Sequence, residues 1–245
     1  MSRRVKDEVA APRAMVTAKQ PPAAEAAADV LERGGNAVDA AVVAALVGGV
    51  LLPLASGIGG GGYLVFHDAA AGTTHVVDYA MQSPSAAVPG FFDIDPAGGF
   101  GTGMGWRKAV DHANWHGWRS MCVPGAVAGL STALERFGTI GFAEALAPAI
   151  ALAEEGFPIS PELASELVSN WPLLQAHPSS FATFTDSGRP LKAGDRLRRP
   201  ALARTLRRLA DHGPRDFYEG EIARGIAADM RDHGGAIDAA DLAGY

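Results

Sequence analysis

The sequence predicts an α+β fold, because many helical stretches accompany only two clear strands. Residues 37–50 are almost entirely Ala, Val, Leu and Gly, which indicates a helix buried on all sides. Residues 63–67 and 74–79 are typical of two antiparallel strands joined by the turn "DAAAGT". These apolar elements need partners on more than one face. Either further strands are weakly marked, or another chain supplies part of the fold.

The remaining segments predict a polar lead-in over residues 1–20, followed by one incomplete domain over 21–245. Asn36 is suited to cap the helix that begins at Ala37, since its side chain can accept a hydrogen bond from a free backbone N–H group. Asp238 is suited to cap a short last helix in the same way. The other expected elements are helices over 21–33, 125–136, 142–155, 161–177, 200–212 and 216–233, and a long loop over 88–118.

Composition limits the functional class. The chain has 245 residues, of which 48% are hydrophobic and 20% charged, as expected for a globular protein. Its net charge of −6 argues against a nucleic-acid surface. Cys122 is the single cysteine, so an internal disulfide framework is excluded. The N-terminus has no apolar signal segment, and glycines and Pro53 interrupt the uncharged stretch 40–66. We therefore expect a cytoplasmic protein without a membrane or nucleic-acid partner.

The glycine run "SGIGGGGYLVF", residues 56–66, is the most unusual local feature. Gly57, Gly59 and Gly62 have the G-x-G-x-x-G spacing of a dinucleotide site, but that motif requires a strand before it and a helix after it. Here a helix precedes the glycines and a strand follows them. A nucleotide-dependent oxidoreductase is therefore a poor interpretation. The glycines either pack a helix against a sheet or let a ligand approach the backbone closely.

Six segments, in one order from about Met15 to Tyr245, resemble the N-terminal part of the γ-glutamyltransferase family. They are "GGNAVDAAVVAAL", "SGIGGGGYLVF", "VPGAVAGL", "LAPAIALAEEGFPIS", "FYEGEIARGIAADM" and "GGAIDAADLAGY". The resemblance implies the N-terminal part of an Ntn-hydrolase αββα sandwich, in which two sheets lie between helical layers. It further implies a precursor that cleaves itself before a threonine. That threonine becomes the nucleophile at the start of a small subunit, with its own α-amine as base.

The resemblance implies that the catalytic residues lie beyond Tyr245. Thr73 and Thr74 precede His75 and imitate the Thr-Thr-His segment of the family's cleavage site, but they fall in the first hairpin, where the family has an ordinary turn. We therefore expect no catalytic residue in this chain and treat both threonines as weak candidates.

The same resemblance suggests where a substrate would bind. Gly60 and Gly61 belong to the glycine run, which in the family enters a central strand near the substrate pocket. Family members carry an arginine for the donor α-carboxylate two residues after the aspartate that ends the second strand, whereas this chain has Ala80 there. Alanine cannot form the paired guanidinium–carboxylate contact. Gln82 and Arg119 are candidate substitutes, and for each a plain surface role remains the alternative.

No metal or cofactor is expected, because His112 and His116 lack a third suitably spaced ligand. The leading hypothesis is a γ-glutamyltransferase-like Ntn hydrolase, acting on glutathione-like or other amides, whose small subunit comes from a downstream segment of the precursor. Two alternatives stay open. One is an acylase for a different amide, and the other is a truncated, non-catalytic relative that binds a ligand or partner. The acyl acceptor and the oligomeric state do not follow from the sequence.

Overall fold

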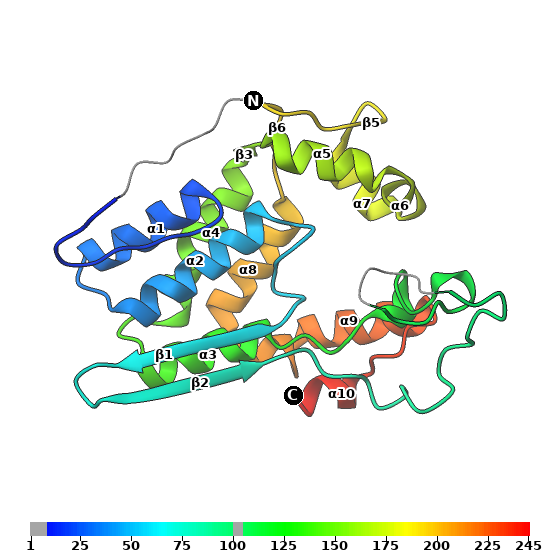
Figure 1. Ribbon diagram of the computed structural model, residues 1–245, viewed down its shortest axis with the longest axis horizontal. Coiled ribbons are helices and arrows are strands. Elements are labelled where there is room, and N and C mark those ends of the chain that lie inside the picture. Colours follow the sequence, from blue (N-terminus) through cyan, green and yellow to red (C-terminus); the bar gives the residue numbers. More distant parts are fainter. Residues whose placement is uncertain (1–8, 100–104) are drawn as a thin grey trace.

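The computed structural model describes residues 9–99 and 105–245 (Figure 1). Four helices pack in sequence as α1 on α2, α2 on α4 and α4 on α8: α1 (Pro21–Glu32), α2 (Ala37–Leu51), α4 (Phe142–Glu155) and α8 (Pro200–His212). Two antiparallel strands form a hairpin that packs on a fifth helix: β1 (Gly62–Asp68), β2 (Thr73–Tyr79) and α3 (Ala126–Phe137). Helix α3 also contacts α2, so the hairpin is attached to the helical layer through α3.

The other elements are short. The helices are α5 (Pro161–Ser169), α6 (Trp171–Ala176), α7 (Pro178–Phe184), α9 (Glu221–Asp232) and α10 (Ala239–Ala243), with 3₁₀ turns η1 (Val110–His112), η2 (Trp118–Ser120) and η3 (Pro214–Phe217). Two antiparallel pairs of two-residue strands complete the set: β3 (Phe157–Pro158) with β6 (Arg196–Leu197), and β4 (Thr185–Asp186) with β5 (Arg189–Pro190). The expected loop over 88–118 contains η1, and its residues 100–104 lie outside the described part.

Helix α2 begins as predicted at an Asn36 cap. The Asn36 side chain accepts hydrogen bonds from the N–H groups of Val38 and Asp39, and the Asp39 carboxylate accepts one from the Asn36 N–H in return. Asp39 is fully buried and also accepts hydrogen bonds from the backbone and side chain of Thr139 and the backbone of Ile140. Burial alone would raise the pKa of Asp39. The hydrogen bonds to its carboxylate outweigh this effect, and the pKa lies below its usual value. One carboxylate thus joins the start of α2 to the turn between α3 and α4.

The expectation that α2 is buried on all sides is wrong along one stripe. Most of its valines and leucines are buried, as the apolar sequence predicts. Ala37, Ala41 and Ala45 are exposed, and their spacing of four places them on one face of the helix. Because alanine is apolar, hydropathy alone could not distinguish this exposed face from a buried one.

Two expected helix boundaries are also wrong. The helix expected over 161–177 is divided at Asn170, because Pro172 has no N–H group and fits only the first turn of a new helix, α6. The helix expected from Asp216 begins at Glu221 instead. Asp216 lies in the preceding η3 turn, where its carboxylate pairs with Arg208 and accepts a hydrogen bond from the Glu221 N–H.

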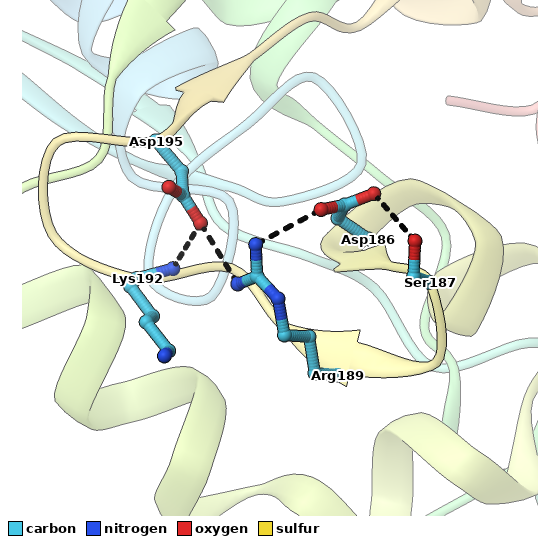
Figure 2. Close-up of polar contacts among 5 residues, drawn as sticks. All are labelled: Asp186, Ser187, Arg189, Lys192 and Asp195. Atoms are coloured by element: carbon cyan, nitrogen blue, oxygen red, sulfur yellow. Dashed lines mark hydrogen bonds and ion pairs between the residues drawn. The ribbon is translucent and has the colours of Figure 1, made fainter.

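The β4–β5 turn, which the sequence analysis did not identify, is held by charged side chains (Figure 2). Arg189 donates hydrogen bonds to Asp186 at 2.9 Å and to Asp195 at 3.2 Å. Asp195 also accepts one from the Lys192 backbone at 2.9 Å, and the Ser187 hydroxyl contacts Asp186 at 3.2 Å. Because these side chains are largely in solvent, the pairs contribute little stability and mainly fix the shape of the turn.

The β1–β2 hairpin has one packed face and one open face. Val77 is buried and packs in the core, with Leu64 and Phe66 partly buried beside it. On the opposite face, Val65 is paired across the strands with Val76, and these side chains are 68% and 61% exposed. We call Tyr63, Val65 and Val76 the open face of the hairpin. Such a cluster of β-branched and aromatic residues is typical of a sheet surface that another layer covers.

Candidate active site

The glycine run forms a tight connection between α2 and β1. The Gly60 carbonyl accepts hydrogen bonds from the N–H groups of Gly125 and Ala126 at 2.9 and 3.0 Å, which joins the run to the start of α3. A Cβ atom on Gly61 would lie 2.5 Å from the Tyr79 carbonyl oxygen, whereas one on Gly60 would meet only the Gly57 oxygen at 3.4 Å. Glycine is therefore required at 61 by the close approach of β2, and much less at 60.

A hollow of about 490 Å³ opens beside the glycine run. Its wall combines the C-terminal half of α2, residues 53–61, Tyr79 at the end of β2, Met81 just after it, the start of α3, and the first half of α8 with its N-cap Arg199. Most of the lining is apolar or glycine backbone. Among the described residues that line it, Arg199 is the one charged side chain. Gly60 and Gly61, both candidate substrate-binding positions, lie in this wall.

Ala80, the position implied for the family's arginine, lies between two residues of that wall. Its N–H donates to the Asp78 carboxylate at 3.0 Å, and its carbonyl accepts a hydrogen bond from the Tyr245 hydroxyl at 2.9 Å. Tyr245 stacks on Tyr218, with ring centroids 5.6 Å apart. The segment after β2 is therefore held by an aromatic side chain from the last residues of the chain.

Tyr218 anchors this aromatic pair in the core. Its hydroxyl donates to the Pro124 carbonyl and accepts from the Ala128 N–H, both at 3.0 Å. Burial raises the pKa of the Tyr218 phenol to about 12, so it remains protonated at neutral pH. The sequence analysis missed Tyr218 and Tyr245 as positioning residues, and the aromatic in "FYEG" was the available signal.

The structure separates the two proposed substitutes for the arginine. Gln82 is exposed just beyond the hollow, and its backbone pairs with Val123 in an isolated β-bridge. Arg119 belongs to η2. Its guanidinium donates to the Phe91 carbonyl and lies over the Phe91 ring, 4.5 Å from the centroid. Arg119 is not among the residues that line the hollow. A substrate-binding role for either residue stays a prediction.

Thr73 and Thr74 lie at the start of β2, at the hairpin turn. The Thr74 hydroxyl is 3.0 Å from Nδ1 of His67, and the Thr73 hydroxyl is 3.2 Å from Nε2 of His75. Both threonines are exposed, and neither lines the hollow. The absence of a catalytic role for Thr73 and Thr74 stays a prediction.

His112 and His116 lie in and after η1, with ring centroids 6.1 Å apart. Burial, followed by the nearby charge of His112, lowers the pKa of His116. Across residues 9–99 and 105–245, no group of three His, Cys, Asp or Glu side chains is gathered as a metal site would require. None of the helices described is both long and apolar enough to cross a membrane.

Comparison with known proteins relates this geometry to one family. The profile described as Gamma-glutamyltranspeptidase matches residues 23–245. The glutathione hydrolase proenzyme of Bacillus subtilis is 35% identical over 231 residues, which cover 94% of this chain and 38% of that protein. The acylase ACY 1 proenzyme of a Pseudomonas species is 38% identical over 236 residues, covering 95% of this chain and 41% of that protein. The chain thus spans less than half the length of these relatives.

A solved structure shares the fold. The γ-glutamyltranspeptidase of Helicobacter pylori superimposes with a TM-score of 0.88 at 32% identity, covering 98% of this chain and 66% of that one. This similarity confirms the predicted fold class, the N-terminal part of an Ntn-hydrolase sandwich.

Proposed function

Because the chain belongs to the γ-glutamyltranspeptidase family, we propose that it is the N-terminal part of an amide hydrolase or acyltransferase. The observation that carries the proposal is the match over residues 23–245 in uninterrupted order, with the glycine run beside a hollow. The nucleophile would attack the amide carbonyl, form an acyl-enzyme and release the amine with a proton. The acyl-enzyme would then pass its acyl group to water or to an amine acceptor, which frees the nucleophile.

We further propose that the nucleophile and the second half of the core come from a segment downstream of Tyr245. Relatives named as proenzymes are more than twice as long as the matched region. The open face of the hairpin supports the same view, because exposed valines on a strand need a covering layer. We call residues 1–245 together with such a segment the complete protein.

The residue at position 80 affects which acyl donor the protein can recognise. A γ-glutamyl amide carries an α-carboxylate, and the family's arginine is absent at the position implied for it. The acylase relative makes a different amide a specific second candidate. In either case the chemistry at the amide carbonyl is the same, and only the recognition of the acyl group differs.

The test is an Ala80→Arg variant of the complete protein, assayed with γ-glutamyl and other acyl anilides. If the family pocket is retained, the new guanidinium should pair with the donor carboxylate. It should then raise kcat/KM for the γ-glutamyl anilide roughly ten- to a hundredfold. No gain, together with turnover of another acyl anilide by the parent protein, would identify an acylase. No turnover of any anilide by processed protein would favour a non-catalytic binding protein.

A further inference from the structure

Several arginines in this structure pair with carboxylates, whereas Arg199 pairs with none among the described residues. Arg189 is bound between Asp186 and Asp195 (Figure 2), and Arg208 between Asp216 and Glu221. Arg199 makes no ion pair with any described carboxylate, although it is one of the less exposed arginines. A largely desolvated charge without a counter-charge is costly, and proteins normally pair it.

The guanidinium of Arg199 is held in place by the end of α2. Its Nη1 donates to the carbonyl oxygens of Gly49 and Val50, each at 3.1 Å. These bonds orient the planar group at the negative end of the helix dipole but use only part of its five N–H donors. No buried polar side-chain atom among the described residues lacks a partner, so the unbonded nitrogens of Arg199 keep some accessible surface. Arg199 is one of the residues that line the hollow.

The glycine run brings further donors to the same end of α2. A Cβ on Gly49 would lie 3.0 Å from the Gly57 Cα, so the two backbones are in contact beside the carbonyl that Arg199 binds. The N–H groups of Gly57, Ile58 and Gly59 donate to no acceptor among the described residues. All three residues line the hollow. Backbone amides next to a guanidinium are the donor set of an anion site.

The remaining wall selects the kind of anion. Leu46, Val50, Leu202 and Leu206 line the hollow, so a bound group would carry its charge at one end and an aliphatic part at the other. Burial lowers the pKa of Arg199 from its very high usual value, yet the group stays protonated at neutral pH.

We propose that this hollow is a subsite for an aliphatic carboxylate, with Arg199 as its cation and the glycine run as its backbone donors. Identifying that carboxylate as part of the acyl group of the substrate rests on the proposed function. The binding itself does not. In the absence of an arginine at position 80, Arg199 would make this enzyme select acyl groups that carry a carboxylate.

The test uses calorimetry on the complete protein with glutarate and with its uncharged diamide as probes. We expect saturable binding of glutarate, no measurable binding of the diamide, and a loss of affinity of roughly ten- to a hundredfold in Arg199→Gln. Arg199→Lys keeps the charge but loses the planar fork, so it should bind with intermediate affinity. Arg207→Gln is the matched control, because Arg207 pairs with Glu154 and does not line the hollow.

Leu202→Trp guards against a folding defect at position 199, since it fills the hollow and leaves Arg199 intact. It should abolish glutarate binding while thermal unfolding stays cooperative. The proposal is overturned if folded protein fails to bind glutarate, if the diamide binds equally well, or if Arg199→Gln binds as the parent does. Glutarate binding that depends on Arg199, in a protein without amide turnover, would uphold the subsite and refute the proposed function.

Discussion

The helical layer and the hairpin differ in how completely they bury their apolar side chains. In the helical layer, Leu146, Leu206 and Leu209 are almost fully buried. The hairpin packs one face on α3, while its open face leaves Val65 and Val76 in solvent. The helical layer therefore encloses its apolar side chains, whereas the hairpin leaves one apolar face exposed. One stripe of α2, formed by Ala37, Ala41 and Ala45, is exposed in the same way.

The glycine run lies between these two regions, and a pair of variants tests how closely they are joined. Gly61→Ala should lower the free energy of unfolding by about 3 kcal/mol, because the new methyl group collides with backbone atoms of Tyr79 and Met81 that cannot move aside. Gly60→Ala should cost less than about 1 kcal/mol, since it meets only one oxygen at 3.4 Å. The measurement is urea unfolding followed by pulse proteolysis at low protein concentration. A cost below about 1 kcal/mol for both variants would show that neither glycine is required by a close backbone contact.

The helical layer should lose stability in acid through Asp216. The Arg208 guanidinium, with hydrogen bonds from the backbone of Glu221 and Ile222, holds the pKa of Asp216 at about 2. A carboxyl group with a depressed pKa contributes its full stability above its unfolded value near 3.8. It loses that stability as the pH falls toward about 2.

We therefore expect about 2 kcal/mol of unfolding free energy to disappear across this window, and Asp216→Asn to remove this part of the pH dependence. The check is a series of unfolding curves from pH 5 to pH 2 for both proteins. An unchanged pH profile in Asp216→Asn would contradict the assignment.

Neighbouring valines on opposite faces of β2 give the smallest and most specific contrast. Val77→Thr places a hydroxyl in the core and should cost about 1.5 kcal/mol in residues 1–245. Val76→Thr has nearly the same shape on the open face and should change the stability by less than about 0.5 kcal/mol. In the complete protein the Val76 variant should become costly as well, if a second layer covers that face. Similar costs for both valines in residues 1–245 would show that the open face is already covered.

Features determined by neighbouring residues were predictable from the sequence. The Asn36 and Asp238 caps, the hairpin and most long helices follow from turn chemistry and periodicity. The exposed stripe of α2 was not predicted, because alanine is common both in cores and on surfaces. The end of α5 was missed because Pro172 was read as part of one helix rather than as the start of another.

The candidate site was predictable only in part, since its contacts join distant residues. The family resemblance suggested Gly60 and Gly61, and the structure places both beside the hollow. Arg199, however, was not identified as a candidate, because its hydrogen bonds to Gly49 and Val50 cross about 150 positions of sequence. The Tyr245 hydroxyl likewise reaches Ala80 over 165 positions. No local pattern encodes such contacts.

The central proposal is that residues 1–245 are one part of a catalytic domain that a downstream segment completes. The most direct measurement compares this segment alone with the complete protein, using hydrophobic-dye binding, light scattering and hydrolysis of acyl anilides. We predict that the segment alone binds dye, aggregates and has no activity, because its open face is uncovered and no N-terminal threonine is present. Supplying the downstream segment, in the same chain or as a second one, should restore both solubility and turnover. A monodisperse segment that binds no dye and hydrolyses a γ-glutamyl anilide would contradict this account and make Thr73 or Thr74 the nucleophile to test.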